Sequence, residues 1–178
     1  MPMIAYADET ARDVPAREAL LDSAFGPARF MKSSERIREG RLPADGLSLV
    51  AHDDGRLVGT VRLWHVAAGR AGADALLLGP LAVAEDLRSA GVGGALMRLA
   101  IARASELGHR AVLLVGDEPY YRRFGFSTLR TQGLAMPGPF ERHRLLALEL
   151  VPGALLGAEG VIRPTGERVP AEAALLAA

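Results

Sequence analysis

The chain has 178 residues, 49% of them apolar, and its 21 basic and 21 acidic side chains leave no net charge. This length predicts one domain with a core of its own, and the lack of cysteine excludes disulfides and thiolate metal sites. No run of Lys and Arg points to nucleic acid, and no apolar run is long enough to span a membrane.

Other features of the sequence bear on metal binding, on where the protein is located and on the kind of organism it comes from. The four histidines, His52, His65, His109 and His143, are widely separated, so we expect no metal. The N-terminal residues are too polar for a signal peptide, which predicts a cytoplasmic protein. High Ala, Gly, Arg and Leu contents with a single Lys are typical of a bacterium with a GC-rich genome.

The N-terminal part predicts a strand and two helices. Residues 3–7 have the pattern of a short strand, and Val14–Phe25 that of a helix with Pro15 in its first turn. A shorter helix is expected over residues 33–39. Its charged side chains are expected to form a solvated face: Glu35, Arg36, Arg38 and Glu39.

A hairpin and a buried strand follow. Two strand-like runs, residues 47–52 and 57–66, flank an Asp-Gly pair, which is a strong hairpin signal. Residues 67–74, rich in Gly and Ala, predict a flexible turn. The apolar run at residues 76–83 predicts the next strand, buried in a sheet.

A glycine-rich turn after this strand carries the strongest functional pattern. It opens a helix with apolar residues at intervals of three and four, which Gly108 ends before a second buried strand at Ala111–Val115. Such a turn presents free backbone N–H groups and the positive end of the helix dipole to an anion. Gly91, Gly93 and Gly94 let a phosphate approach closely because they have no Cβ.

Two familiar nucleotide-binding patterns fail here on residue identity. A dinucleotide fingerprint requires a glycine where Leu96 stands, and a nucleoside-triphosphate loop requires a lysine that does not follow these glycines. The pattern that fits is R-x-x-G-x-G, from Arg88 through Gly91 to Gly93. A tyrosine four residues before Gly125 follows it further along the chain.

The chain beyond Val115 predicts a short helix, a weakly marked hairpin and a tail. Asp117 is expected to cap a helix that Gly125 ends. The last strand is expected at residues 144–150, and the strand before it, at about 126–135, is poorly marked. The Gly-, Ala- and Pro-rich residues 152–178 predict a tail beyond a single domain at 1–151, either loose or packed on a partner subunit.

These motifs resemble the GNAT superfamily of N-acetyltransferases, whose pyrophosphate-binding signature is Q/R-x-x-G-x-G/A and whose later motif has Tyr four residues before a Gly. The run GPLAV resembles the family's fourth strand, and GDEPYYRRFGF resembles a bacterial subgroup of predicted N-acetyltransferases. The resemblance implies a GNAT-like acyl-CoA N-acyltransferase fold of the α/β class, with a mixed central sheet of about six to seven strands flanked by about four helices. It also implies acetyl-CoA as the acyl donor.

The resemblance suggests how acetyl-CoA would be held. Arg88 and the backbone N–H groups of the turn would bind the pyrophosphate, and the pantetheine arm would pair with the strand edge at residues 81–83. A backbone amide near Leu81 is the candidate donor to the thioester oxygen. The cofactor-binding residues implied are Leu81, Ala82, Val83, Arg88, Ser89, Ala90, Gly91, Val92, Gly93 and Gly94.

The resemblance also names a proton donor. Tyr121 stands at the position of the family's general acid, and a phenol stays protonated at pH 7. The base is open among Asp117, Glu118 and His65, but the structural explanation is favoured for each: Asp117 and Glu118 as carboxylates at a helix start, and His65 as a packing residue of a strand. One departure is Leu114, which stands where many members have an Asn that contacts the pantetheine arm.

The predicted activity is transfer of an acetyl group to a primary amine by direct attack in a ternary complex. The acceptor is not identified: Trp64, Phe30, Met31 and Arg62 are candidates to line its side, unless they belong to the core. The alternative is a non-catalytic acyl-CoA-binding sensor or interaction module, which needs no proton donor. A third interpretation is a small α/β domain acting in protein association. A homodimer is a further expectation from the resemblance.

Overall fold

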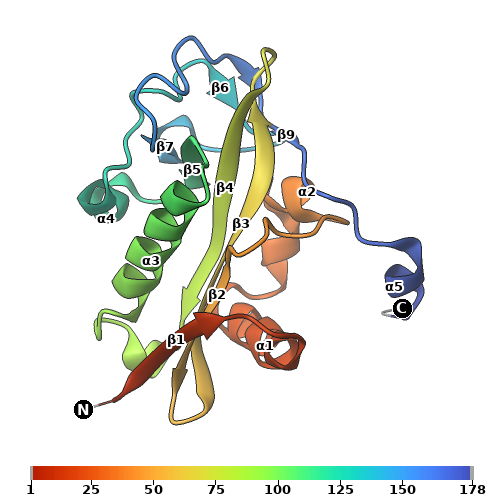
Figure 1. Ribbon diagram of the computed structural model, residues 1–178, viewed down its shortest axis with the longest axis vertical. Coiled ribbons are helices and arrows are strands. Elements are labelled where there is room, and N and C mark those ends of the chain that lie inside the picture. Colours follow the sequence, from red (N-terminus) through yellow and green to blue (C-terminus); the bar gives the residue numbers. More distant parts are fainter. Residues whose placement is uncertain (1, 177–178) are drawn as a thin grey trace.

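A mixed sheet of seven strands runs through the molecule (Figure 1). The computed structural model describes residues 2–176. The strand order is β1-β2-β3-β4-β5-β7, with β9 also paired to β3, and β4–β5 is the parallel pair among the described strands of this sheet. The strands are β1 (Ile4–Asp8), β2 (Ser48–Asp53), β3 (Arg56–Ala68), β4 (Ala73–Val83), β5 (Ala111–Val115), β7 (Leu145–Glu149) and β9 (Arg163–Pro164). The predicted mixed α/β sheet is confirmed.

Helices cover both faces of the sheet. The long helix α3 lies on one face, and α1 and α2 lie on the other (Figure 1). The helices are α1 (Val14–Phe25), α2 (Glu35–Arg38), α3 (Val92–Glu106), α4 (Glu118–Tyr121) and α5 (Ala171–Leu176). Single 3₁₀ turns are η1 (Ala11–Asp13), η2 (Pro27–Met31), η3 (Glu85–Leu87), η4 (Arg122–Phe124) and η5 (Arg142–Arg144). The bounds predicted for the first helix are confirmed.

The position of α3 depends on a glycine in the sheet. The buried side chains of α3 are Val92, Leu96, Met97, Ala100 and Ala104, which repeat at helical spacing. A Cβ at Gly59 of β3 would lie 2.9 Å from Leu96 Cδ1 and 3.0 Å from Val92 Cγ1. Gly59 therefore lets the first turns of α3, which carry the glycine-rich motif, pack directly on β3.

Two predicted segments in the first half differ from the structure. The flexible turn expected at 67–74 is only four residues long, because β3 continues to Ala68 and β4 begins at Ala73. The alanines there gave no strand signal. The second helix is the four-residue α2, and its charges are not all solvated, since the Arg38 side chain is only 14% exposed.

The strand expected at about 126–135 is mostly replaced by turns. A single bridge joins Ser127 to Ala147, and β6 (Leu134–Ala135) pairs with β8 (Gly160–Val161) instead of β7. Side chains form hydrogen bonds with backbone groups that would otherwise pair with a neighbouring strand. The Thr131 hydroxyl donates to the Leu145 carbonyl at 2.6 Å, and Arg142 donates to three backbone carbonyls between 131 and 134.

Part of the segment 152–178 packs on the sheet. Leu155 and Ile162 are buried in the apolar cluster that contains Trp64, and β9 pairs with β3. Its Gly, Ala and Pro content favours irregular backbone, but two apolar side chains are enough to hold it against the domain. In residues 2–176, no helix has both the length and the apolar character needed to cross a bilayer.

Candidate active site

The site begins where β4 and β5 separate. These parallel strands pair only at Leu76–Val112 and Leu77–Leu113, whereas β4 stays paired with β3 as far as Val83. The register of β3 and β4 shifts beside Gly79. The edge of β4 that faces β5 is therefore open beyond Leu77.

The backbone groups at this edge follow from strand alternation. The Ala84 amide donates to the Val58 carbonyl of β3 at 2.8 Å. Because backbone groups alternate along a strand, those of Ala82 also point to β3, and those of Leu81 and Val83 point to the open edge. Three residues of this edge were predicted to contact the cofactor. Leu81 and Val83 direct their amides toward the open edge, and Ala82 does not.

A cleft of about 520 Å³ occupies the gap between the strands. Four segments line most of it: residues 32–35 before and within α2, 77–81 of β4, 114–117 after β5, and 139–141 before η5. Arg29, Arg38, Tyr121 and Arg144 add their side chains to the lining. The cleft therefore combines residues from segments that are far apart in the sequence.

The N-terminus of α3 carries the predicted anion-binding turn. Ser89 and Gly91 have positive φ values of 75° and 83°. The amides of Ser89, Gly91, Val92, Gly93 and Gly94 have no hydrogen-bond acceptor among the described residues. The amide of Ala90 differs from the expectation, because it already donates to the Leu87 carbonyl at 3.1 Å. Five of the amides in this turn are therefore available to an anion.

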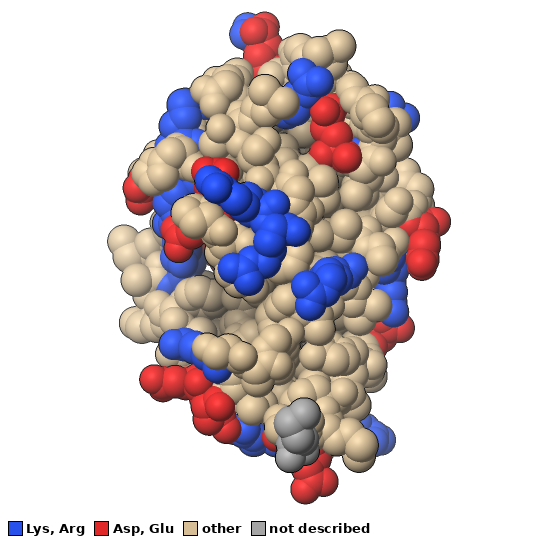
Figure 2. All heavy atoms as spheres, turned by 90° about the vertical axis from the view of Figure 1, so that its left-hand side faces the viewer, with Lys and Arg blue, Asp and Glu red and all other residues tan. Residues whose placement is uncertain are grey.

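Basic side chains surround this end of the molecule. Figure 2 shows the face that carries α3 and α4, where a group of basic side chains lies near the middle and others lie around it. Arg88, Arg98, Arg122 and Arg123 are all exposed. Arg98 lies over the Phe124 ring and Arg123 over the Tyr120 ring, so aromatic side chains support two of these cations. This surface favours a multiply charged anion.

The two neighbouring tyrosines point to different places. The ring of Tyr121 lies in the cleft against Gly116, where a Cβ would overlap with Tyr121 Cε2. The Tyr120 hydroxyl instead lies beside the start of α3, 3.2 Å from the position of a Cβ on Gly93. Burial, with help from Tyr120 and Asp117, raises the pKa of Tyr121 to about 12. Tyr121 is therefore a protonated hydroxyl in the cleft at neutral pH.

The candidate bases do not all lie at the site. His65 lines a separate small cleft with His109. Glu118 of α4 pairs with Arg122 of η4, outside the main cleft. Asp117 does line the main cleft and contacts Arg144 Nε at 3.3 Å. Glu35 was not among the candidates, yet it lines the same cleft, because the short α2 places it there.

The candidates for the acceptor side are also placed differently. Trp64 belongs to the core, and its indole N–H donates to the Gly79 carbonyl at 2.7 Å. Arg62 binds Glu9, and Phe30 and Met31 are largely exposed. None of the four lines the main cleft. The side chains that do so include Lys32, Arg38 and Arg144, which no motif marks, since only the tertiary fold brings them to β4.

The site has the features that a cofactor of the expected kind requires. The open edge of β4 and the free amides at the start of α3 suit an extended thioester with a pyrophosphate. Leu114, at the position where many GNAT members have Asn, is buried and lines the cleft, so it offers no polar contact there. Within the described part of the chain, no three His, Asp or Glu side chains are grouped as metal ligands.

The sequence and the fold place the chain among known proteins. Residues 44–128 match the model of the acetyltransferase (GNAT) domain. The chain is 30% identical over 150 residues to the uncharacterized N-acetyltransferase YhbS of Escherichia coli, covering 84% of this chain and 89% of YhbS. It is 32% identical over 126 residues to the uncharacterized N-acetyltransferase YjhQ of E. coli, covering 68% and 69%.

Solved structures agree with this relationship. The crystal structure of E. coli YhbS in complex with CoA is similar with a TM-score of 0.77 and 29% identity, covering 93% of this chain and 91% of that one. A GNAT family acetyltransferase from Brucella melitensis in complex with acetyl-CoA shares the fold, with a TM-score of 0.60, 24% identity and coverage of 96% and 98%. The chain belongs to the GNAT family of N-acetyltransferases.

Proposed function

We propose that this protein transfers the acetyl group of acetyl-CoA to a primary amine by direct attack in a ternary complex. One observation carries the proposal. The open edge of β4 connects the free amides at the start of α3 to the cleft that holds Tyr121. A pyrophosphate, an extended arm and a thioester are joined in that order in acetyl-CoA, and the three features are arranged in the same order here.

The pyrophosphate would lie on the amides of Ser89 and Gly91–Gly94, with Arg88 adding charge. The Ala90 amide already donates within the turn, so Ala90 would lie beside the pyrophosphate without donating to it. The pantetheine arm would pair with the edge at Leu81 and Val83, with Ala82 turned toward β3. The relatives crystallised with CoA and acetyl-CoA support this assignment.

The reaction needs two proton movements. The amine nitrogen attacks the thioester carbon, the oxygen becomes negative, and the Leu81 amide is our candidate to stabilise it. A free alkylammonium must lose a proton before it attacks, and the carboxylates that line the cleft and could accept it are Asp117, Glu35 and Glu141. The C–S bond then breaks, and Tyr121 provides a proton or a hydrogen bond to the departing sulfur.

The pKa of Tyr121 bears on the last step. An ordinary thiol has a pKa of about 8.5, well below the value of about 12 for Tyr121. Full proton transfer from Tyr121 to the thiolate therefore becomes more favourable if burial in the cleft also raises the pKa of the thiol. In either case, a phenol that stays protonated stabilises the negative sulfur by donating a hydrogen bond.

Calorimetric titration of acetyl-CoA and CoA into wild type and Gly91→Trp tests the proposal. Gly91 has open space around its Cβ position, so a large side chain would occupy the space of the pyrophosphate. Gly108→Trp is the matched control, because Gly108 lies at the other end of α3 with a similar φ of +85° and equally open surroundings. We expect Gly91→Trp alone to lose binding.

Release of free thiol with a panel of amines then separates catalysis from binding. Binding of acetyl-CoA with turnover of at least one amine supports the enzyme. Binding without turnover of any amine supports a non-catalytic acyl-CoA-binding module. If folded wild-type protein binds neither CoA species, the proposal is wrong. The homodimer expected from the family resemblance is part of the proposal and is measured on the same samples by sedimentation.

A further inference from the structure

The wall of the cleft formed by α2 and the residues before it contains two cations with little neutralising charge. They are Lys32, just before α2, and Arg38, at the end of α2. This matters for the proposed function, on which the following inference rests, because the acceptor amine must enter this same cleft.

Arg38 has hydrogen-bonding capacity that the protein does not use. Its side chain is 14% exposed, and within residues 2–176 its ion-pair partner is Glu35 at 3.8 Å and its Nε has no hydrogen-bond partner. A guanidinium offers five N–H donors in a planar fork. Burial lowers the pKa of Arg38 to about 10, which still leaves it charged at neutral pH.

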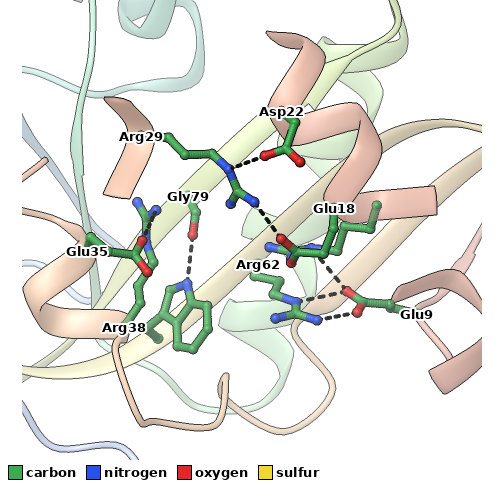
Figure 3. Close-up of polar contacts among 10 residues, drawn as sticks. Glu9, Glu18, Asp22, Arg29, Glu35, Arg38, Arg62 and Gly79 are labelled. Carbon is green, nitrogen blue, oxygen red and sulfur yellow. Dashed lines mark hydrogen bonds and ion pairs between the residues drawn. The ribbon is translucent and has the colours of Figure 1, made fainter. Parts of the chain in front are cut away.

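The position of Arg38 relative to β4 is well defined. A Cβ on Gly79 would lie 3.1 Å from Arg38 Nη2, so the guanidinium rests on the backbone of β4. Gly79 is two residues before Leu81, whose amide is the proposed donor to the thioester oxygen. Figure 3 shows Arg38 beside Gly79 and Glu35, on the same side of the sheet as Arg29.

Lys32 adds a second positive charge. Its ammonium lies 4.6 Å from the centre of the Phe25 ring, and no described carboxylate lies within ion-pair distance of it. Burial lowers the pKa of Lys32, and the charges of Arg38 and Arg144 lower it further. The positive charges that line the cleft therefore repel one another.

Nearby arginines are in a different situation. Arg29 is held by Glu18 at 2.5 Å and by Asp22 at 3.0 Å (Figure 3). Arg144 contacts Asp117 at 3.3 Å on the other side of the cleft. Among the described residues, Glu35 is the carboxylate that forms an ion pair with Arg38, and none forms one with Lys32.

We propose that the acceptor of this enzyme carries an anionic oxygen group, carboxylate or phosphate, close to its primary amine, and that Arg38 and Lys32 bind that group. The fork of Arg38 fits two oxygens of such an anion, and Lys32 adds a point charge. An anion held over Gly79 brings an amine on a short linker next to the thioester. Neutral amines lack this anchor.

Matched acceptor pairs test the inference. Initial rates of thiol release are compared for glycine and glycinamide, and for phosphoethanolamine and ethanolamine. We expect kcat/KM for one acidic member to exceed that of its neutral partner about 10-fold or more, which is the effect of one strong charge-assisted hydrogen bond. The two pairs distinguish a carboxylate from a phosphate.

Variants identify the residues responsible. Arg38→Gln is expected to bring the acidic-to-neutral ratio close to one, and Lys32→Met to reduce it in part, with acetyl-CoA affinity unchanged. Arg38→Lys keeps the charge without the fork and is expected to retain part of the preference. The control Arg36→Gln removes the same charge from the same helix, but Arg36 is exposed and donates to the Pro137 carbonyl outside the cleft.

Each remaining outcome decides the matter. Equal kcat/KM within both pairs, or a preference that survives in Arg38→Gln, overturns this inference and leaves the proposed function standing. Failure to bind acetyl-CoA overturns both. If acetyl-CoA binds but none of the four amines is acetylated, N-acetylglycine and N-acetylglycinamide are titrated into CoA-saturated protein. Tighter binding of the acid that is lost in Arg38→Gln supports the inference, and equal or absent binding overturns it.

Discussion

The indole N–H of Trp64 donates to the carbonyl oxygen of Gly79 at 2.7 Å, in the buried interior of the molecule. This bond holds the backbone of β4 at the point where it leaves β5. The guanidinium of Arg38 also packs against Gly79. One hydrogen bond from the core thus positions the backbone on which the cleft is built.

We predict that Trp64→Phe destabilises the protein by about 2 kcal/mol, because it leaves a buried carbonyl without its donor and removes part of a packed side chain. The affinity for acetyl-CoA should fall as well, since the edge at Leu81 loses its support. Urea unfolding followed by circular dichroism measures the first effect, because Trp64 is the single Trp of the chain and the variant has no indole fluorescence. An unchanged unfolding midpoint would contradict this prediction.

The second prediction concerns the proton donor. Tyr121→Phe should lower kcat 10-fold or more, while the affinity for acetyl-CoA stays within a few-fold, because the ring that packs on Gly116 is retained. Tyr120→Phe is the control: it removes the neighbouring hydroxyl, which lies near Gly93 and outside the cleft. Steady-state kinetics with calorimetry separates the two parameters. Equal kcat values for Tyr121→Phe and wild type would remove Tyr121 from the role of acid.

The same tyrosine predicts a pH dependence of stability. Its folded pKa of about 12 exceeds the value of about 10 in an unfolded chain. The unfolded state therefore loses this proton first as pH rises, so the contribution is complete below pH about 10 and is lost between about 10 and 12. We expect a loss on the order of 2 kcal/mol across this window, and a smaller one in Tyr121→Phe. Urea unfolding at a series of pH values measures both, and parallel curves would show that Tyr121 titrates normally.

The ion pairs at the start of the chain should stabilise the fold. The side chain of Glu9 is 5% exposed and binds Arg62, and Arg17 Nε lies 3.6 Å from it. Glu9→Gln leaves Arg62 without its counter-charge and Arg17 with Glu18 alone, at 2.8 Å, so we predict a loss of about 3–5 kcal/mol. Asp22→Asn, which breaks a pair whose carboxylate is 61% exposed, should cost about 1 kcal/mol or less. Similar unfolding midpoints for the two variants would contradict this difference.

The contact between α3 and β3 gives the last prediction. Gly59→Ala would force a methyl group against Leu96 and Val92, so we expect a loss of about 1–3 kcal/mol and weaker binding of acetyl-CoA as the start of α3 is displaced. Adding Leu96→Val removes the atom nearest to the new methyl and should restore binding in part. If the double variant binds no better than Gly59→Ala alone, the contact is not the cause.

Much of the fold was readable from local pattern. The helix Val14–Phe25, the hairpin around the Asp-Gly pair, and the order of strand, glycine-rich turn, helix and strand all depend on neighbours in the chain, and the structure confirms them. The weakly patterned segments were harder. Ala67, Ala68 and Ala73 extend two strands without any signal, and Thr131 replaces ladder bonds with its hydroxyl.

The sequence by itself determined the glycine-rich start of α3 and the tyrosine motif, because hydrogen-bond donors at a helix N-terminus and a glycine at positive φ are local properties of the backbone. Only the tertiary structure decided which charges meet in the cleft. Lys32, Glu35 and Arg38 are far in sequence from Gly79 and Tyr121, and α2 is too short to show a face by periodicity. Their place at the site depends on the packing of α2 against β3 and β4, which no spacing of residues records.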